Sequence, residues 1–171
     1  LLESADRAGM AVDAAAVRNG LRTVLWEGRL EVIGEYPTVV LDGAHNPAAA
    51  HALAEYLKDF AVSHPTSRVI LVWGMMRDKD RRGFIDPLLP CVSEIVLTQA
   101  TLARSATVQE LRATLLEWQG PVREAVLPMD ALTVARSRAM PHDLICIAGS
   151  LMLLGDVKAA VRGCGLSPIR G

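Results

Sequence analysis

Thr38-Val39-Val40-Leu41-Asp42-Gly43-Ala44-His45-Asn46-Pro47 is the stretch of sequence that decides the fold. Thr38–Leu41 is a short, apolar-rich segment, which is typical of a strand. Gly43 permits a tight turn of the backbone, and Pro47 is tolerated in the first turn of a helix, where its missing N–H costs nothing. The stretch therefore predicts a strand, a turn and a helix in immediate succession.

Strand and helix signals continue to alternate toward the C-terminus. The helix after Pro47 carries an apolar stripe, and Arg68–Trp73 is an apolar run typical of a strand buried on both faces. Further strands are expected at Glu94–Thr98, Val122–Val126 and Leu144–Ala148. Between them we expect a short helix ending near Pro90, a helix from the capping box Thr107/Glu110 to Trp118, and helices over 130–139 and 151–161. This alternation predicts an α/β domain in three layers, with a mainly parallel sheet of about six strands.

The segments that precede and follow this unit give weaker signals. Arg29–Ile33 predicts another strand, which Gly34 and Pro37 separate from the next one, so that it pairs antiparallel at an edge. Residues 1–25 predict one helix with an apolar face at Val17, Leu21, Val24 and Leu25. We expect this helix to have packed on a preceding domain, and the tail 163–171 to be poorly ordered.

Composition excludes several classes of protein. Hydrophobic residues make up 51% and charged residues 22% of the chain, as in ordinary globular proteins, and the net charge of −1 provides no field for nucleic acid or a membrane surface. No apolar run reaches the length of a membrane-spanning helix. Three scattered cysteines and four histidines predict neither disulfides nor a metal site, which suits the cytoplasm. The first residue is Leu1, so we expect a piece of a longer protein.

Three polar segments follow predicted strands: Asp42–Pro47, Gly74–Asp80 and Gly149-Ser150. Ligands of open α/β sheets bind beyond the carboxyl ends of the strands, so these segments are expected to gather at one edge. Asp42 is suited to accept hydrogen bonds from ribose hydroxyls, and His45 to approach a phosphate. The local alternative, in which Asp42 and Asn46 only cap the turn and the helix, stays open on spacing alone.

Four motifs, in this order, resemble one family. They are Trp26 with Gly28-Arg29-Leu30-Glu31, the run Leu41–Pro47, Gly74-Met75-Met76-Arg77-Asp78-Lys79-Asp80, and Gly149-Ser150-Leu151. Together they look like the C-terminal domain of folylpolyglutamate synthases and dihydrofolate synthases, in the Mur ligase superfamily. The resemblance implies a Rossmann-like glutamate ligase domain over 26–171, preceded by a helix and linker, 1–25, left from an ATP-binding domain.

The resemblance also implies a reaction and a division of its site. Such enzymes transfer the γ-phosphate of ATP to a carboxylate of dihydropteroate or a folate, and the amine of L-glutamate attacks the acyl phosphate. It implies that Arg29 reaches the nucleotide phosphates, that Asp42 holds the ribose and that His45 lies beside the nucleotide. Ser150 would contact glutamate, and Arg104, which follows another strand, is suited to pair with a glutamate carboxylate. The phosphate loop, which this sequence lacks, and the Mg²⁺ ligands would belong to the enzyme's own N-terminal ATPase domain.

Each candidate has a structural alternative. Arg29 can be an exposed edge-strand charge beside Glu31, Ser150 can cap the last helix, and Arg104 can be an ordinary surface arginine. For Asp78-Lys79-Asp80 we prefer the structural role, with acids at a helix N-terminus and a solvated lysine.

The expected function is therefore ATP-dependent ligation of glutamate to dihydropteroate or a folate, with little activity in this chain alone. A Mur-type peptidoglycan amino-acid ligase and a non-catalytic nucleotide-binding module remain alternatives. A dinucleotide oxidoreductase is disfavoured because no Gly-x-Gly-x-x-Gly follows a strand. Two departures from the family pattern, Glu27 and Met152, are not expected to touch the polar contacts.

Overall fold

The computed structural model describes residues 2–10, 13–24 and 26–163. The strands are β1 Glu31–Glu35, β2 Thr38–Asp42, β3 Val69–Trp73, β4 Glu94–Leu97, β5 Val122–Glu124 and β6 Leu144–Ala148. The helices are α1 Leu2–Arg7, α2 Ala14–Thr23, α3 Pro47–Ser63, α4 Arg81–Ile85, the 3₁₀ helix η1 Leu89–Cys91, α5 Val108–Arg112, α6 Pro128–Arg138 and α7 Leu151–Gly163.

The strands form one six-stranded sheet in the order β1-β2-β6-β3-β4-β5. β1 pairs antiparallel with β2 at one edge, and all the other pairs are parallel. The predicted fold class is therefore confirmed. In the central pairs Ala148 lies opposite both Asp42 and Trp73, so the carboxyl ends of β2, β6 and β3 are level.

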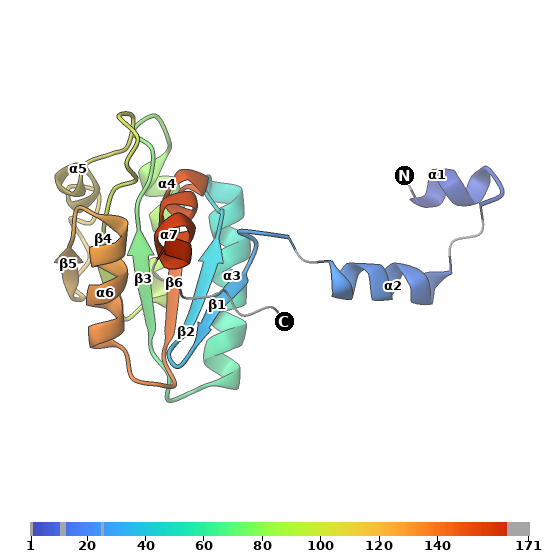
Figure 1. The fold of residues 1–171 in the computed structure, drawn as a ribbon, viewed down its shortest axis with the longest axis horizontal. Helices are drawn as coiled ribbons and strands as arrows, with labels where there is room; N and C mark the ends of the chain where they lie inside the picture. The colour runs from blue at the N-terminus through green and yellow to red at the C-terminus, as the bar shows by residue number, and fades with distance from the viewer. Residues whose placement is uncertain (1, 11–12, 25, 164–171) are drawn as a thin grey trace.

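Helices cover both faces of the sheet (Figure 1). α3, α4 and α5 pack on one face through a core that includes Leu57, Trp73 and Phe84. α6 and α7 pack on the other face through a core that includes Leu132 and Val157. β3 and β6 are buried along their whole length, which explains their uninterrupted apolar sequences.

The first predicted strand was placed wrongly. β1 begins at Glu31 rather than at Arg29 and runs through Gly34, with a register shift between Val32 and Gly34. Before it the backbone turns sharply, since Gly28 and Leu30 have φ of +70° and +46°. This left-handed pair keeps Arg29 out of the sheet and places it on a turn.

The helix expected from Thr107 to Trp118 was also wrong in length. The capping box of Thr107 and Glu110 is present, but α5 ends at Arg112. The Thr114 hydroxyl donates to the Glu110 carbonyl, and such side-chain bonds compete with a regular helix. In the same region β5 ends at Glu124, two residues early, and α6 begins at Pro128, two residues before the predicted start.

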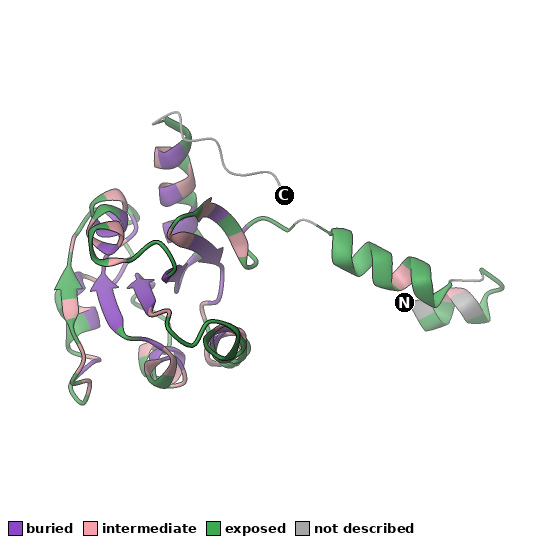
Figure 2. Cartoon of the chain, turned by 90° about the horizontal axis from the view of Figure 1, so that it is seen from below, coloured by how far each residue is buried: buried purple, intermediate pink, exposed green. Residues whose placement is uncertain are grey.

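The predicted N-terminal helix is two helices, α1 and α2, in the described residues 2–10 and 13–24. Gly9 has φ of +82°, and Asp13 caps α2 by accepting from Ala15 N at 3.1 Å. α2 buries no side chain (Figure 2), and Leu21 of the predicted apolar face is exposed. Leu25 and residues 164–171 of the predicted tail lie outside the described residues, while Gly163 belongs to α7.

Candidate functional site

The three segments that follow β2, β3 and β6 meet at one edge of the sheet, as predicted. Gly149 N donates to Ala44 O at 2.9 Å, and Gly74 N to Ala148 O at 3.4 Å. Gly149 has φ of +112°, and a Cβ placed there would lie 2.5 Å from Gly74 O. The close approach of the two turns therefore requires glycine at this position.

A cavity of about 170 Å³ opens where these turns meet. Its lining residues are His45, Met76, Lys79, Arg104, Gly149, Ser150, Leu151 and Met152. Three of the predicted site residues, namely His45, Ser150 and Arg104, are thus brought together. Arg29 and Asp42 are not part of this lining.

Asp42 is buried and hydrogen-bonded on both oxygens. Its Oδ1 accepts from Ala44 N at 2.8 Å and its Oδ2 from Leu30 N at 3.1 Å. The local capping role considered for Asp42 is therefore present. Each carboxylate oxygen has a second lone pair, so these bonds leave acceptor capacity.

His45 is held by its own turn. Nδ1 lies 2.8 Å from Gly43 O. Because a carbonyl only accepts, this contact assigns the proton to Nδ1 and leaves Nε2 of the neutral ring as an acceptor. When the ring is protonated, Nε2 becomes a donor that can face an anion.

Ser150 and Arg104 approach the cavity from two different loops. Ser150 is buried, and its Oγ accepts from Met152 N at 3.1 Å, which is the capping contact of α7. The hydroxyl hydrogen of Ser150 can still donate. Arg104 has an exposed side chain, and its backbone O accepts from Arg77 N at 2.9 Å.

Arg29 lies on the turn before β1 with its side chain exposed. Its interpretation as a strand charge beside Glu31 is wrong, since Arg29 is not in the strand. Glu31 instead accepts from Gly28 N at 2.7 Å and from Lys158 Nζ at 2.9 and 3.0 Å. Among the described residues, Arg29 has no ion-pair partner.

Within Asp78-Lys79-Asp80, one residue caps a helix and another lines the cavity. Asp80 caps α4 by accepting from Gly83 N at 2.9 Å, as expected of an acid at a helix N-terminus. Lys79, in contrast, lines the cavity and was missed as a site residue. Its place after β3, at the edge where the other candidates gather, was the available signal. Met152 lines the cavity too, so this departure from the family pattern does reach the site.

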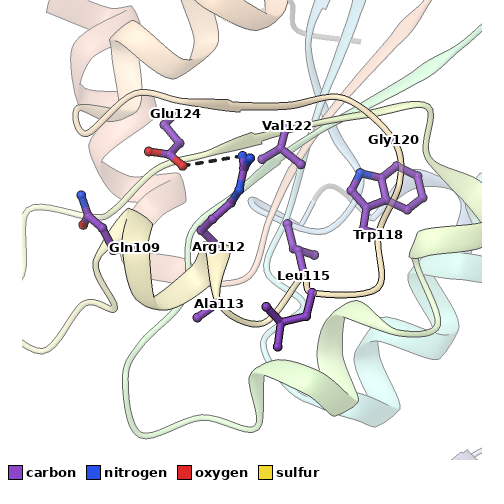
Figure 3. A pocket seen from close by; sticks show the side chains of 9 residues that line it. Gln109, Arg112, Ala113, Leu115, Trp118, Gly120, Val122 and Glu124 are labelled. Atoms are coloured by element: carbon purple, nitrogen blue, oxygen red, sulfur yellow. Dashed lines mark ion pairs between the residues drawn. The ribbon is translucent and has the colours of Figure 1, made fainter.

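A larger hollow of about 470 Å³ lies beside α5 and β5 and shares no residue with the cavity (Figure 3). Trp118, Leu115 and Val122 line it, and Arg112 Nη1 lies 3.6 Å from Glu124 Oε1 across it. Two other features are absent from residues 2–10, 13–24 and 26–163. In these residues no three His, Cys, Asp or Glu side chains lie close enough together to hold a metal ion. None of the helices in that part of the chain is long and apolar enough to cross a membrane.

Comparison with known proteins gives one family and a consistent set of relatives. The family described as "Mur ligase, glutamate ligase domain" matches residues 28–151. A probable bifunctional folylpolyglutamate synthase/dihydropteroate synthase of Haloferax volcanii is 38% identical over 148 residues, which are 86% of this chain and 17% of that protein.

Solved structures agree in fold. Escherichia coli FolC in complex with DHPP and ADP superposes with a TM-score of 0.81 at 28% identity, over 95% of this chain and 38% of that one. A folylpolyglutamate synthase/dihydrofolate synthase with Mn, AMPPNP and L-glutamate bound gives 0.77 at 29% identity, over 89% of this chain and 36% of that one. This chain thus spans well under half the length of these relatives. By its matched residues, its sheet and its edge of converging turns, the chain belongs to the family of Mur ligase glutamate ligase domains.

Proposed function

We propose that this chain supplies the glutamate-binding part of an ATP-dependent ligase, which joins L-glutamate to dihydropteroate or a folate through an acyl phosphate. The curated relatives carry folylpolyglutamate or dihydrofolate synthase names, and this chain matches only a part of each. The residues that bind the pterin and most of the nucleotide would then belong to the enzyme's N-terminal ATPase domain. Residues 1–25 would lead from that domain into the one at 26–171.

The observation that carries the proposal is the cavity at the ends of β3 and β6. Two cations, Arg104 and Lys79, and the buried hydroxyl of Ser150 line the same 170 Å³ space. Glutamate presents two carboxylates, and charge-assisted hydrogen bonds from a guanidinium and an ammonium are the strong way to hold them. A solved relative contains L-glutamate together with AMPPNP and Mn, which supports a glutamate site in this family.

The nucleotide would lie against the neighbouring part of the edge. Arg29 projects from its turn without an ion-pair partner among the described residues, so its guanidinium is available to phosphate oxygens. Asp42 would accept from the ribose hydroxyls with its remaining lone pairs, and Nε2 of His45 would face the nucleotide. ADP in the Escherichia coli relative supports nucleotide binding by such a pair of domains.

A divalent metal ion is implied by the Mn in a solved relative, and Mg²⁺ is the ion we propose. The described residues of this chain contain no cluster of metal ligands, so the ion would be held by the other domain. The role of this chain is to orient the glutamate amine toward the acyl phosphate and to place cations beside the charge that develops there.

The protein would work in the cytoplasm. Cys146 is a free, buried thiol and Cys91 a free, partly buried one, which suits a reducing compartment.

The test assays the full-length enzyme with ATP and glutamate, using dihydropteroate, tetrahydrofolate and a peptidoglycan precursor as acceptors. We expect glutamate-dependent ADP release with one or both pterins, and little with this chain alone. Turnover only with the peptidoglycan precursor would move the protein to that branch of the superfamily, and glutamate-dependent ATP hydrolysis by this chain alone would contradict the division of the site.

The glutamate site is tested with a matched pair of arginines. Arg104→Ala should raise the KM for glutamate about tenfold, as the loss of one charged hydrogen bond predicts. Arg112→Ala is the control, because Arg112 is also exposed but lies at the other hollow. Equal KM values for the two variants would remove Arg104 from the site.

A further inference from the structure

We propose that Asp156 and Lys158 of α7 are positioning residues, which hold the segments carrying Arg104 and Arg29 on opposite sides of the site. The inference rests on the proposed function, because it assigns Arg104 to glutamate and Arg29 to the nucleotide. It adds two residues that no motif of the sequence marks and gives α7 a role beyond its N-terminal Ser150.

α7 is placed to reach both sides. It follows β6, which has β2 on one side in the sheet and β3 on the other, and it packs on both β6 and β2 (Figure 1). In an α-helix each residue turns by about 100°, so positions 156 and 158 point in nearly opposite directions. One side faces the loop after β4, and the other faces the turn before β1.

Asp156 holds the loop that carries Arg104. Its Oδ2 accepts from Thr101 N at 2.8 Å and its Oδ1 from the Thr101 hydroxyl at 2.9 Å. At the other end of this loop Arg77 N donates to Arg104 O, and Ala106 N to Met75 O, both at 2.9 Å. The loop from 101 to 106 is therefore tied to α7 on one side and to the segment after β3 on the other.

Lys158 holds the turn that carries Arg29. Its Nζ donates to both oxygens of Glu31, at 2.9 and 3.0 Å, and to Glu27 Oε2 at 2.6 Å. Glu31 Oε2 in turn accepts from Gly28 N at 2.7 Å. A chain of bonds thus runs from α7 through one carboxylate to the residue directly before Arg29.

The turn that carries Arg29 contains an unfavourable backbone conformation, which hydrogen bonds from neighbouring elements stabilise. Leu30 has φ of +46°, a left-handed conformation that residues with a side chain rarely adopt. The bond from Leu30 N to Asp42 Oδ2 fixes one end of the turn, and the carboxylate of Glu31, paired with Lys158, fixes the other end through Gly28 N. The side chain of Lys158 is only 13% exposed. Burial lowers the pKa of Lys158, but its hydrogen bonds to Glu27 and Glu31 outweigh this and leave the pKa above its ordinary value, so the ammonium stays charged.

Variants of the two residues should change different kinetic parameters. Initial rates of the full-length ligase, measured with glutamate and ATP varied in turn, separate these effects. Asp156→Ala, which removes both acceptor oxygens, should raise the KM for glutamate about tenfold and change the KM for ATP less than about twofold, because a small displacement of a binding group has effects of this order. Lys158→Met should lower kcat/KM for ATP about tenfold and leave the KM for glutamate within about twofold. Each variant is the control for the other, since both remove side-chain hydrogen bonds made by the same helix.

Two further variants keep the test decisive if one of these fails to fold. Lys158→Arg retains the charge and should restore the ATP parameters, while Thr101→Val removes the hydroxyl and should reproduce the glutamate effect. Amide hydrogen exchange in this chain adds a readout without activity: Asp156→Ala should speed exchange at Thr101 and not at Gly28, and Lys158→Met the reverse. Equal changes in both parameters, or in neither, would overturn the positioning roles. If the wild-type enzyme does not use glutamate at all, it is the proposed function that is wrong, and this result is distinct from a failure of the positioning roles.

Discussion

At the scale of single residues, Gly149 shows how the backbone at the site restricts the side chain. Its φ of +112° is a conformation that only glycine adopts readily, and a Cβ would lie 2.8 Å from Trp73 Cδ1 as well as against Gly74 O. Both neighbours belong to β3 or the turn after it. A larger residue here would therefore push apart the two turns that form the cavity.

Gly149→Ala should lower the free energy of unfolding by about 3 kcal/mol, since it combines backbone strain with a steric clash in a buried place. Gly155→Ala is the control. Gly155 is exposed within α7, and a Cβ added there would meet no atom within 4 Å, so alanine should raise stability by about 0.5–1 kcal/mol. Urea unfolding followed by circular dichroism measures both. Equal stability of the two variants would contradict the role given to the turn.

The sequence predicted some of the residues that line the cavity and missed others, for physical reasons. His45, Ser150 and Arg104 were found because each follows a strand whose carboxyl end is at the same edge. Lys79 was missed, because spacing alone does not show whether a lysine after a strand faces a cavity or solvent. Arg29 was placed in a strand because the left-handed conformation of Leu30 is set by its contact with Asp42, which no local propensity reveals.

At the scale of secondary-structure elements, Asp143 joins three of them. Its Oδ1 accepts from Arg68 N, directly before β3, at 2.8 Å, and its Oδ2 accepts from Met140 N, after α6, also at 2.8 Å. The Arg68 guanidinium adds a third bond at 2.8 Å. Burial raises the pKa of Asp143, but these three bonds outweigh it and leave the pKa below its ordinary value.

Asp143→Asn should therefore lower the free energy of unfolding by about 2–3 kcal/mol at neutral pH, because it breaks a buried charged contact. An acid whose folded pKa is lowered stabilises the fold above its unfolded pKa, about 3.9, and loses that contribution as the pH falls through the folded pKa. The difference between wild type and variant should thus be full at pH 7 and shrink below about pH 4. Urea unfolding across this range measures it.

Glu55→Gln is the control for Asp143. Glu55 also has a lowered pKa, chiefly through its hydrogen bond with Lys58, but both side chains are exposed on α3. Exposed pairs contribute little, so this variant should unfold as the wild type does. A pH-independent effect of Asp143→Asn would mean that shape rather than charge holds the three elements together.

The ends of elements were less predictable than their presence. The apolar spacing that placed Leu115 and Trp118 on a helix is equally satisfied by the turns they occupy, where Leu115 N bonds Arg112 O and Trp118 N bonds Leu115 O. Both residues still pack into the core layer. Periodicity reports which side chains are buried, and successive turns can bury the same set as a helix.

At the scale of the whole molecule, the alternation of strands and helices in the sequence was sufficient to predict a mainly parallel sheet. It was not sufficient to predict the order of the strands within that sheet. β6, the last strand in the chain, lies between β2 and β3, the second and third. Its apolar sequence shows that it is buried on both faces but not which neighbours it has. That position nevertheless determines the site, because it brings Gly149-Ser150 between the turns after β2 and β3.

The two N-terminal helices provide the last prediction. α2 buries no side chain, and Figure 1 shows α1 and α2 away from the sheet. Deleting residues 1–24 should therefore change the free energy of unfolding of the remaining domain by less than about 0.5 kcal/mol.

A longer deletion, of residues 1–30, tests where the folded domain begins. This cut removes Gly28 O, which accepts from Gly43 N at 2.6 Å, and Leu30 N, which donates to Asp42. Buried groups that lose their partners destabilise a fold, so this deletion should cost about 2 kcal/mol. Circular dichroism during urea unfolding measures both truncations. Equal losses would show that residues 1–24 support the sheet after all, whereas a loss confined to the longer deletion would place the edge of the folded domain at the turn that carries Arg29.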